Sequence, residues 1–249
     1  MDKTIRAKTY GCLEPELYFS KSVSISSDTT EHDDTADFKV LLQLEPPSIV
    51  DLTIPIIKNQ DNFDLILAWK QEILDACKNS VFLPFGSCWI EDEDHGIHDK
   101  NKLVSIIASN KHITIGHKLR HAIIATDKTL DLFGRGYKPI DNKITALKDY
   151  MFSVVIENST TKNYFSEKIV DCLITGTVPV FWGCENIADF FDERGFIFFD
   201  SVKEYKQIRD SLTKEKYLEM LPFIQKNYEL SLNYIKFAKR VEKEINKKI

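Results

Sequence analysis

The 249-residue sequence lacks any long apolar run. No segment approaches the roughly 18 to 20 apolar residues that a membrane-spanning helix needs. The first residues, MDKTIRAKTYGCLEPELYF, contain no apolar stretch of the kind that a signal peptide carries. We therefore expect a cytoplasmic protein without a transmembrane segment. A basic surplus is missing as well, because the formal net charge is −5, and this argues against a dedicated nucleic-acid binder.

Paired cysteines and a dinucleotide motif are also missing. The cysteines are five, scattered and without a C-x-x-C pair, so the sequence predicts reduced thiols and neither a disulfide framework nor a zinc site. They are Cys12, Cys77, Cys88, Cys172 and Cys184. No G-x-G-x-x-G follows the first expected strand, which sets aside a dinucleotide oxidoreductase. His95 and His98 lie in the acidic stretch 89–102 without helical spacing, so a solvated linker is favoured there over a metal site.

What the sequence does contain is an alternation of short apolar runs with helical patterns. The stretch 20–37, rich in Ser, Thr and Asp, predicts a loop. Strands are expected at 37–44, 63–69, 80–84, 103–108, 130–133, 150–156, 178–182 and 196–199, with helices between many of them. This alternation is typical of parallel sheets. We predict an α/β fold with two Rossmann-like lobes facing across a cleft: a short first lobe, 1–99, a second lobe, 100–225, and a C-terminal helix, 226–249, packing back on the lobes.

The most informative segment is 157–183. Ser166 stands where a helix N-cap is expected, directly before Glu167 and Lys168. The free N–H groups and partial positive charge of a helix start suit a diphosphate, and Lys168 adds a cation there. Glu167 is well placed to accept hydrogen bonds from ribose or sugar hydroxyls. Tyr164 offers a ring face or a hydroxyl to a sugar or a base.

This segment resembles the donor-binding motif of the family 10 glycosyltransferases, the α-1,3/4-fucosyltransferases. The family pattern runs roughly F-E-N-S, Y-[IV]-[ST]-E-K and A-G-x-[VI]-P-V, followed by a Gly. The corresponding stretches here are I-E-N-S at 156–159, Y-F-S-E-K at 164–168, T-G-T-V-P-V at 175–180, and Gly183. The departures, at 156, 165 and 175, touch none of the polar groups.

Further stretches agree with the resemblance and follow the order of the family. They are Leu44-Glu45-Pro46-Pro47, Phe82-Leu-Pro-Phe-Gly86, Ser109-Asn110 with Arg120, and Asp131-Leu-Phe-Gly134. The resemblance covers roughly 38–199. It is strong in the second lobe and weaker in the first, which is shorter than usual for the family.

The resemblance implies an inverting transferase with a two-lobe GT-B fold. The second lobe then binds GDP-fucose, and the first lobe binds a glycan acceptor. Glu45 is the general base that the acceptor hydroxyl needs. Arg120 and Lys168, with the helix start at Ser166, stabilise the departing GDP. No metal ligand and no required cofactor are expected, because fixed cations and a helix end can replace a divalent ion, which at most stimulates the reaction.

The remaining donor-side candidates have less specific roles. Asn158, Tyr164 and Glu167 hold the sugar, phosphate or ribose of the donor. Glu157 is favoured as a structural residue beside the donor. Ser109 and Asn110 either contact the donor or only form a turn. The remaining donor-side candidates are thus Ser109, Asn110, Glu157, Asn158, Tyr164 and Glu167.

Two other functions remain open at this point. A fold of this type also serves UDP-sugars, and no residue reads guanine directly. A sugar-nucleotide-binding or carbohydrate-binding protein without turnover is the second alternative, although Glu45, a carboxylate that binding alone does not need, speaks against it. The last helix has apolar residues at helical spacing and a basic opposite face, so it either packs on the lobes or makes a peripheral membrane contact.

Overall fold

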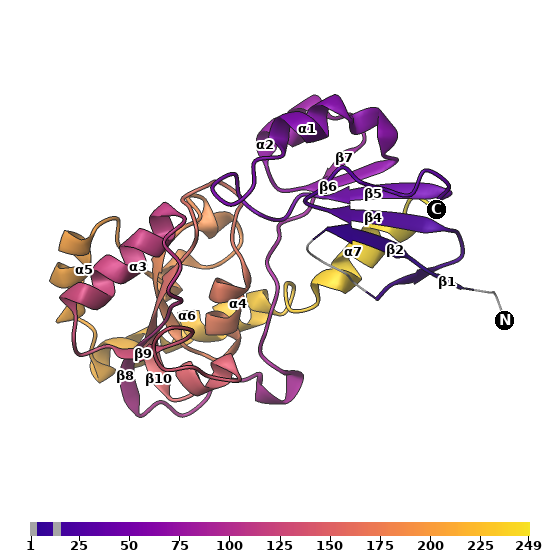
Figure 1. Cartoon of the computed structure of the whole chain (residues 1–249). Coiled ribbons are helices and arrows are strands. Elements are labelled where there is room, and N and C mark those ends of the chain that lie inside the picture. The colour runs from indigo at the N-terminus through magenta and orange to yellow at the C-terminus, as the bar shows by residue number, and fades with distance from the viewer. Residues whose placement is uncertain (1–3, 12–15) are drawn as a thin grey trace. The chain divides into compact units, whose positions relative to one another are not determined.

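The computed structural model describes residues 4–11 and 16–249, and these fall into two compact units (Figure 1). The first unit combines the described residues up to Phe85 with Lys236–Ile249, and the second is Gly86–Ile235. The first boundary thus lies before the acidic stretch rather than after residue 99. The reason is that this stretch bonds to the second unit: Gly96 N donates to Ile174 O at 3.0 Å, and Asn101 N donates to Asp149 O at 2.9 Å.

The first unit is built on a parallel sheet of order β2-β4-β5-β6-β7. Its strands are β2 (Lys8–Gly11), β4 (Val23–Ser27), β5 (Phe38–Leu42), β6 (Leu65–Ala68) and β7 (Ser80–Phe82). A short antiparallel pair, β1 (Ile5–Arg6) and β3 (Tyr18–Phe19), lies outside this sheet.

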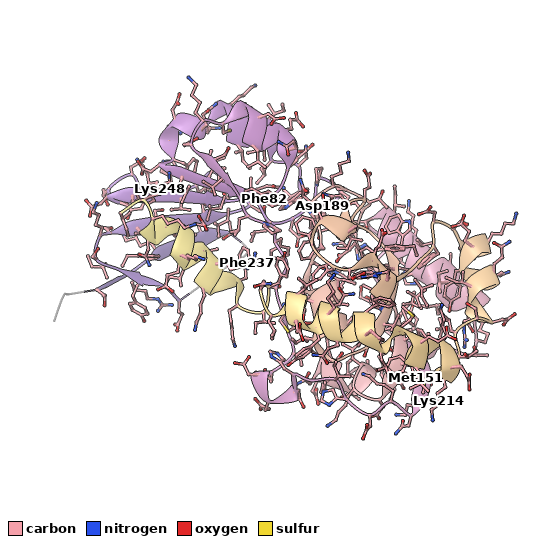
Figure 2. All side chains as sticks on the ribbon, turned by 180° about the vertical axis from the view of Figure 1, so that it is seen from behind. Phe82, Met151, Asp189, Lys214, Phe237 and Lys248 are labelled. Atoms are coloured by element: carbon pink, nitrogen blue, oxygen red, sulfur yellow. The ribbon has the colours of Figure 1, made fainter. Side chains whose placement is uncertain are left out.

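Helices cover both faces of this sheet. Helices α1 (Thr53–Lys58) and α2 (Gln71–Ala76) share a core with Leu41 and Ile66, whereas the 3-10 turn η1 (Gln60–Asn62) between them in the chain buries no residue. The C-terminal helix α7 (Phe237–Asn246) packs with Val40 and Leu42 on the other face, through its buried residues Phe237, Val241 and Ile245 (Figure 2). Neighbouring strand residues point to opposite faces, so Val40 and Leu41 belong to different cores.

The expected loop at 20–37 is wrong, because β4 lies inside it and all five of its residues are buried. The serines of β4 misled the sequence interpretation, since a buried hydroxyl needs a hydrogen-bond partner. Here the loop that follows the strand supplies the partners: Ser24 Oγ accepts from Asp33 N at 3.0 Å, and Ser26 Oγ donates to Glu31 O. A polar strand can therefore lie between β2 and β5.

The second unit has a parallel sheet of order β12-β11-β10-β8-β9, so the α/β prediction is confirmed. Its strands are β8 (Lys102–Ile107), β9 (Asp131–Phe133), β10 (Tyr150–Ile156), β11 (Val178–Trp182) and β12 (Ile197–Phe198). The chain runs from β8 to β9 on one side and then crosses to β10 on the other. The sheet order therefore reverses between β8 and β10, the position where ligands bind in folds of this kind.

Helices on both faces complete this unit. They are α3 (Ile115–Thr126), α4 (Glu167–Ile174), α5 (Val202–Arg209) and α6 (Lys214–Ser231), with 3-10 turns η2 (Asp92–Asp94), η3 (Lys143–Ala146), η4 (Ile187–Asp189) and η5 (Glu193–Gly195). Ile123 of α3 shares a core with Val154, whereas Ile169 of α4 shares one with Val155. Helices α3 and α4 therefore flank β10 from opposite faces.

No helix in the described ranges is long and apolar enough to cross a membrane. The cysteines Cys77, Cys88, Cys172 and Cys184 are free thiols, and burial raises the pKa of each. Cys12 lies outside the described residues.

Candidate active site

Glu45 follows β5 at the carboxyl end of the first sheet, where it is half-buried. Asp28, directly after β4, fixes the backbone there: its carboxylate accepts from Leu44 N at 2.9 Å and from Glu45 N at 3.0 Å. Asp28 has a φ of 49°, in the left-handed region that Asp tolerates better than most residues. Trp69, which directly follows β6, donates from Nε1 to Leu44 O at a distance of 2.9 Å. Glu45 therefore leaves a turn that its two neighbouring strands hold in place.

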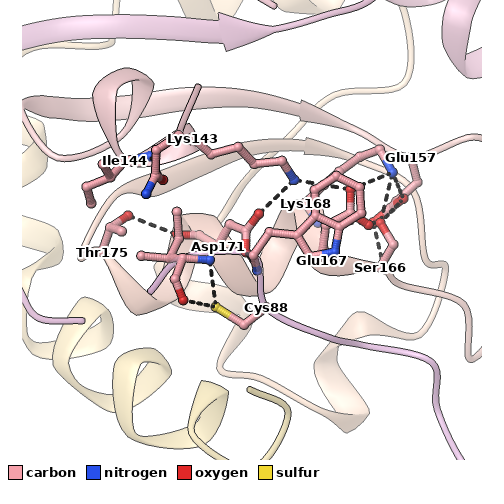
Figure 3. Close-up of polar contacts among 12 residues, drawn as sticks. Cys88, Lys143, Ile144, Glu157, Ser166, Glu167, Lys168, Asp171 and Thr175 are labelled. Atoms are coloured by element: carbon pink, nitrogen blue, oxygen red, sulfur yellow. Dashed lines mark hydrogen bonds and ion pairs between the residues drawn. The ribbon is translucent and has the colours of Figure 1, made fainter. Parts of the chain in front are cut away.

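The centre of the candidate site is the start of α4, which lies beside the end of β10 (Figure 3). Glu157 directly follows β10 and is 0% exposed. Its Oε1 accepts from Ser166 N at 2.9 Å, and its Oε2 accepts from Ser166 Oγ at 2.8 Å. Ser166 caps the helix, since its Oγ also accepts from Lys168 N at 3.4 Å. The buried carboxylate thus anchors the first turn of α4.

Lys168 joins this network through its ammonium group. Its Nζ donates to Ser166 Oγ at 2.9 Å and lies 3.4 Å from Glu157 Oε2, and 26% of its side chain remains exposed. Burial alone would lower the pKa of Lys168, but the carboxylates of Glu157 and Glu167 raise it above its ordinary value. Lys168 therefore keeps its positive charge at neutral pH, at a helix start that already favours anions.

Arg120 of α3 reaches the same end of β10. Its Nε and Nη2 donate to Ile156 O at 3.0 and 2.7 Å, and Nη2 also donates to Asn158 Oδ1 at 3.1 Å. The close approach of α3 requires Gly116, because a Cβ there would lie 1.8 Å from the carbonyl oxygen of Glu157. Arg120 and Asn158 are thus brought together with the Glu157 network.

A second set of contacts on α4 involves Lys143 and Asp171, which the sequence analysis did not predict as site residues. Lys143 Nζ donates to Asp171 Oδ2 at 2.7 Å and to Glu167 Oε1 at 3.2 Å (Figure 3). Burial would raise the pKa of Glu167, but Lys168 and Lys143 lower it to about 2. Asp171 Oδ1 also accepts from Trp89 N at 2.7 Å. The available signal was the helical i, i+4 spacing of Glu167 and Asp171, which places both carboxylates on one face of α4.

Three further predicted residues differ in how open they are to a ligand: Tyr164 is buried, Ser109 is half-buried and Asn110 is exposed. Tyr164 is only 1% exposed, so its ring is packed inside the unit. Ser109 and Asn110 follow β8, next to β10 in the sheet, and hold a turn there. Ser109 Oγ accepts from Lys111 N at 3.4 Å, and Asn110 N donates to Arg135 O at 3.0 Å.

The histidines of the acidic stretch hold its turns. His95 Nε2 bonds to Ile90 O at 3.0 Å, and His98 Nε2 bonds to Asp94 O at 2.8 Å. Throughout the part of the chain that the structure describes, no group of three or more His, Cys, Asp or Glu side chains is placed to hold a metal ion.

The N-terminus of α3 contains a capping box with a histidine in the place usually taken by Glu or Gln. His117 N donates to Thr114 Oγ1 at 3.1 Å, and Thr114 N donates back to His117 Nδ1 at 3.2 Å. This second bond needs an unprotonated Nδ1. Burial and the nearby charge of Arg120 lower the pKa of His117 to about 4, so the imidazole is neutral at pH 7.

We predict that this capping box makes stability acid-sensitive. In the unfolded chain His117 protonates near pH 6.5, whereas in the folded protein it protonates only near pH 4. The unfolded state therefore binds more protons in this window, and the free energy of unfolding falls, on the order of 2 kcal/mol, as the pH drops from about 6.5 to about 4. Urea unfolding across this range should show a flatter profile for His117→Gln, which keeps the box. Parallel profiles would refute this origin.

Two parallel α/β units, of which the second is doubly wound and has a charged helix start beside its central strand, form the architecture expected of a nucleotide-sugar glycosyltransferase. The sequence model of glycosyltransferase family 10 (fucosyltransferase), C-terminal part, matches residues 97–248. The chain therefore belongs to glycosyltransferase family 10, and the predicted resemblance is confirmed.

Individual relatives agree with this assignment. The chain is 31% identical over 103 residues to the α-(1,3)-fucosyltransferase FucT of Helicobacter pylori, a match that covers 39% of this chain and 20% of that protein. It is 36% identical over 50 residues to an α-(1,4)-fucosyltransferase of Arabidopsis thaliana, covering 20% of this chain and 12% of that one. The matches thus span a fifth or less of these curated relatives.

Solved structures extend the likeness of the fold to most of the chain. An α1,3-fucosyltransferase solved with GDP matches with a TM-score of 0.57 at 18% identity, covering 86% of this chain and 77% of that one. An α1,3-fucosyltransferase structure with GDP-fucose matches with a TM-score of 0.54 at 19% identity and the same coverage. These likenesses establish the GT-B fold.

Proposed function

We propose that this protein transfers fucose from GDP-fucose to a hydroxyl of a glycan acceptor, with inversion at the anomeric carbon. The observation that carries the proposal is the anchored start of α4, where Glu157, Ser166 and Lys168 form one bonded network. These residues lie in the segment that resembles the family's donor-binding motif, within the range 97–248 that the family model matches.

The network suits a diphosphate leaving group. The first N–H groups of α4, the ammonium of Lys168 and the guanidinium of Arg120 all lie near the end of β10. Negative charge grows on the diphosphate as its bond to the sugar breaks, and cations already in place stabilise this charge without rearrangement. Asn158, held by Arg120, and Glu167 are the proposed contacts to the donor's sugar and ribose. Glu157 acts by positioning Ser166 and Lys168.

In the proposed step, the acceptor oxygen bonds to the anomeric carbon of fucose while the bond from that carbon to the β-phosphate oxygen breaks. Glu45 accepts the proton of the acceptor hydroxyl, and GDP leaves with the electron pair of the broken bond.

We also propose that Lys168 and Arg120 supply the positive charge that a divalent ion supplies in metal-dependent transferases. Chelation with EDTA should therefore leave the transfer rate within about twofold of its value without EDTA.

We further propose that any membrane contact of this protein is peripheral. The apolar residues of α7 are buried against the first sheet. The exposed lysines Lys239 and Lys243 remain as a basic surface on this helix. Such a surface supports weak attraction to anionic lipid rather than insertion.

Donor binding tests the proposal most directly. Calorimetric titration should show GDP and GDP-fucose binding at least tenfold more tightly than UDP, with and without Mg²⁺. Tighter binding of UDP would indicate that the donor is a UDP-sugar, and the proposal of a glycosyltransferase would stand. Absence of nucleotide binding would contradict the proposal and favour a carbohydrate-binding protein without turnover.

A further inference from the structure

Trp89 is 64% exposed, whereas the other tryptophans, Trp69 and Trp182, are buried. An exposed indole of this size leaves a flat apolar surface available to a partner. The only other large aromatic side chain of the second unit exposed to a similar degree is Phe198, at 46%, and it stacks on Phe196 with ring centroids 5.6 Å apart.

The structure holds Trp89 in place at two points. Its backbone N donates to Asp171 Oδ1 at 2.7 Å, and the ammonium of Lys143 lies 4.2 Å from its ring centroid. Lys143 is itself bonded to Asp171 and Glu167, at 2.7 and 3.2 Å. The ring is thus fixed before any ligand arrives, which lowers the entropic cost of binding.

These contacts place the ring relative to the proposed donor site. Lys168 and Ser166 lie at the first turn of α4 and face the diphosphate in the proposed function. Glu167, the proposed ribose contact, is joined through Lys143 to the ring of Trp89. In a nucleoside diphosphate the base follows the ribose on the side away from the phosphates. Diphosphate, ribose and base therefore match Lys168, Glu167 and Trp89 in the same order.

We propose that the exposed indole of Trp89 is the stacking surface for the nucleobase of the donor. This inference rests on the proposed function and adds a base-binding residue to it. Lys143 lies over the ring and adds a cation–π contact. The free part of the indole offers a flat apolar surface, which a purine covers efficiently.

Calorimetry with two ligands separates stacking from phosphate binding. For Trp89→Leu, the Kd for GDP should rise about tenfold or more, as expected when an aromatic stacking partner is lost. The Kd for pyrophosphate, which has no base, should stay within twofold. Trp89→Tyr should keep most of the GDP affinity. Phe198→Leu, the matched change of an exposed aromatic residue, should leave both affinities unchanged.

Fluorescence of the unmodified protein gives a readout that needs no leucine variant. GDP should quench tryptophan emission strongly and pyrophosphate should not, and Trp89→Tyr should abolish the quenching. If Trp89→Leu binds GDP like the wild type and no quenching occurs, the stacking proposal is overturned while the proposed function stands. If the wild type binds no GDP, the proposed function itself fails.

Discussion

Glu45→Gln should lower kcat for fucose transfer by about 100- to 10,000-fold, the range that a general base contributes. The amide has nearly the shape of the carboxylate but cannot accept the acceptor proton at neutral pH. The turn should survive, because Asp28 bonds to the backbone N–H groups of Leu44 and Glu45 and not to the exchanged side-chain atoms. Initial rates at saturating GDP-fucose, with the Kd for GDP-fucose measured in parallel, would show a loss confined to turnover.

A matched control for this change is Glu31→Gln. Glu31 is exposed in the same unit, and the contact it offers to Ser26 uses its backbone oxygen, so its side-chain charge can be removed without disturbing the sheet. We expect wild-type turnover for this variant. Wild-type turnover in Glu45→Gln would instead mean that Glu45 is an ordinary turn residue, and the proton acceptor would have to be sought elsewhere.

The second unit was predicted best, because its elements are encoded locally. Residues 150–156 and 178–182 were expected as strands, and β10 and β11 have these bounds. The continuous apolar run of β10 predicts a strand that is buried on both faces. β4 is equally buried but was missed, since three of its five residues are serines, and Ser24 and Ser26 find their partners in the following loop.

The candidate site divides in the same way. Glu157, Ser166 and Lys168 lie within a short stretch of sequence, so one motif contained them all. Trp89 and Asp171, by contrast, are 82 residues apart and meet only through the tertiary fold. The acidic composition around Trp89 predicted a solvated linker, whereas the stretch is bonded to the second unit. Asp28 was not predicted either, because β4 was taken for part of a loop. The sequence therefore did not indicate that Asp28 lies next to the turn of Glu45.

Lys168→Met should lower kcat/KM for GDP-fucose by about 100- to 1,000-fold, the loss typical of removing one preorganised charge from a transition state. The pKa of Lys168 is raised by Glu157 and Glu167, so the wild-type side chain is fully charged at neutral pH. Methionine fills a similar volume without charge. Lys162→Met, an exposed change in the preceding loop, should have no effect. Rates and GDP binding should be compared well below the melting temperature of each variant.

The same variant should also be less stable, roughly by 2 kcal/mol, because the fully buried Glu157 carboxylate loses its cation. The double variant Glu157→Gln with Lys168→Met separates the two effects, since it removes both charges of the pair. If Lys168 acts on the diphosphate, the double variant should recover much of the lost stability, measured by urea unfolding, while its transfer rate stays low. Recovery of the rate together with stability would show that Lys168 serves only to neutralise Glu157, and that Arg120 and the N–H groups of α4 carry the charge of the departing GDP.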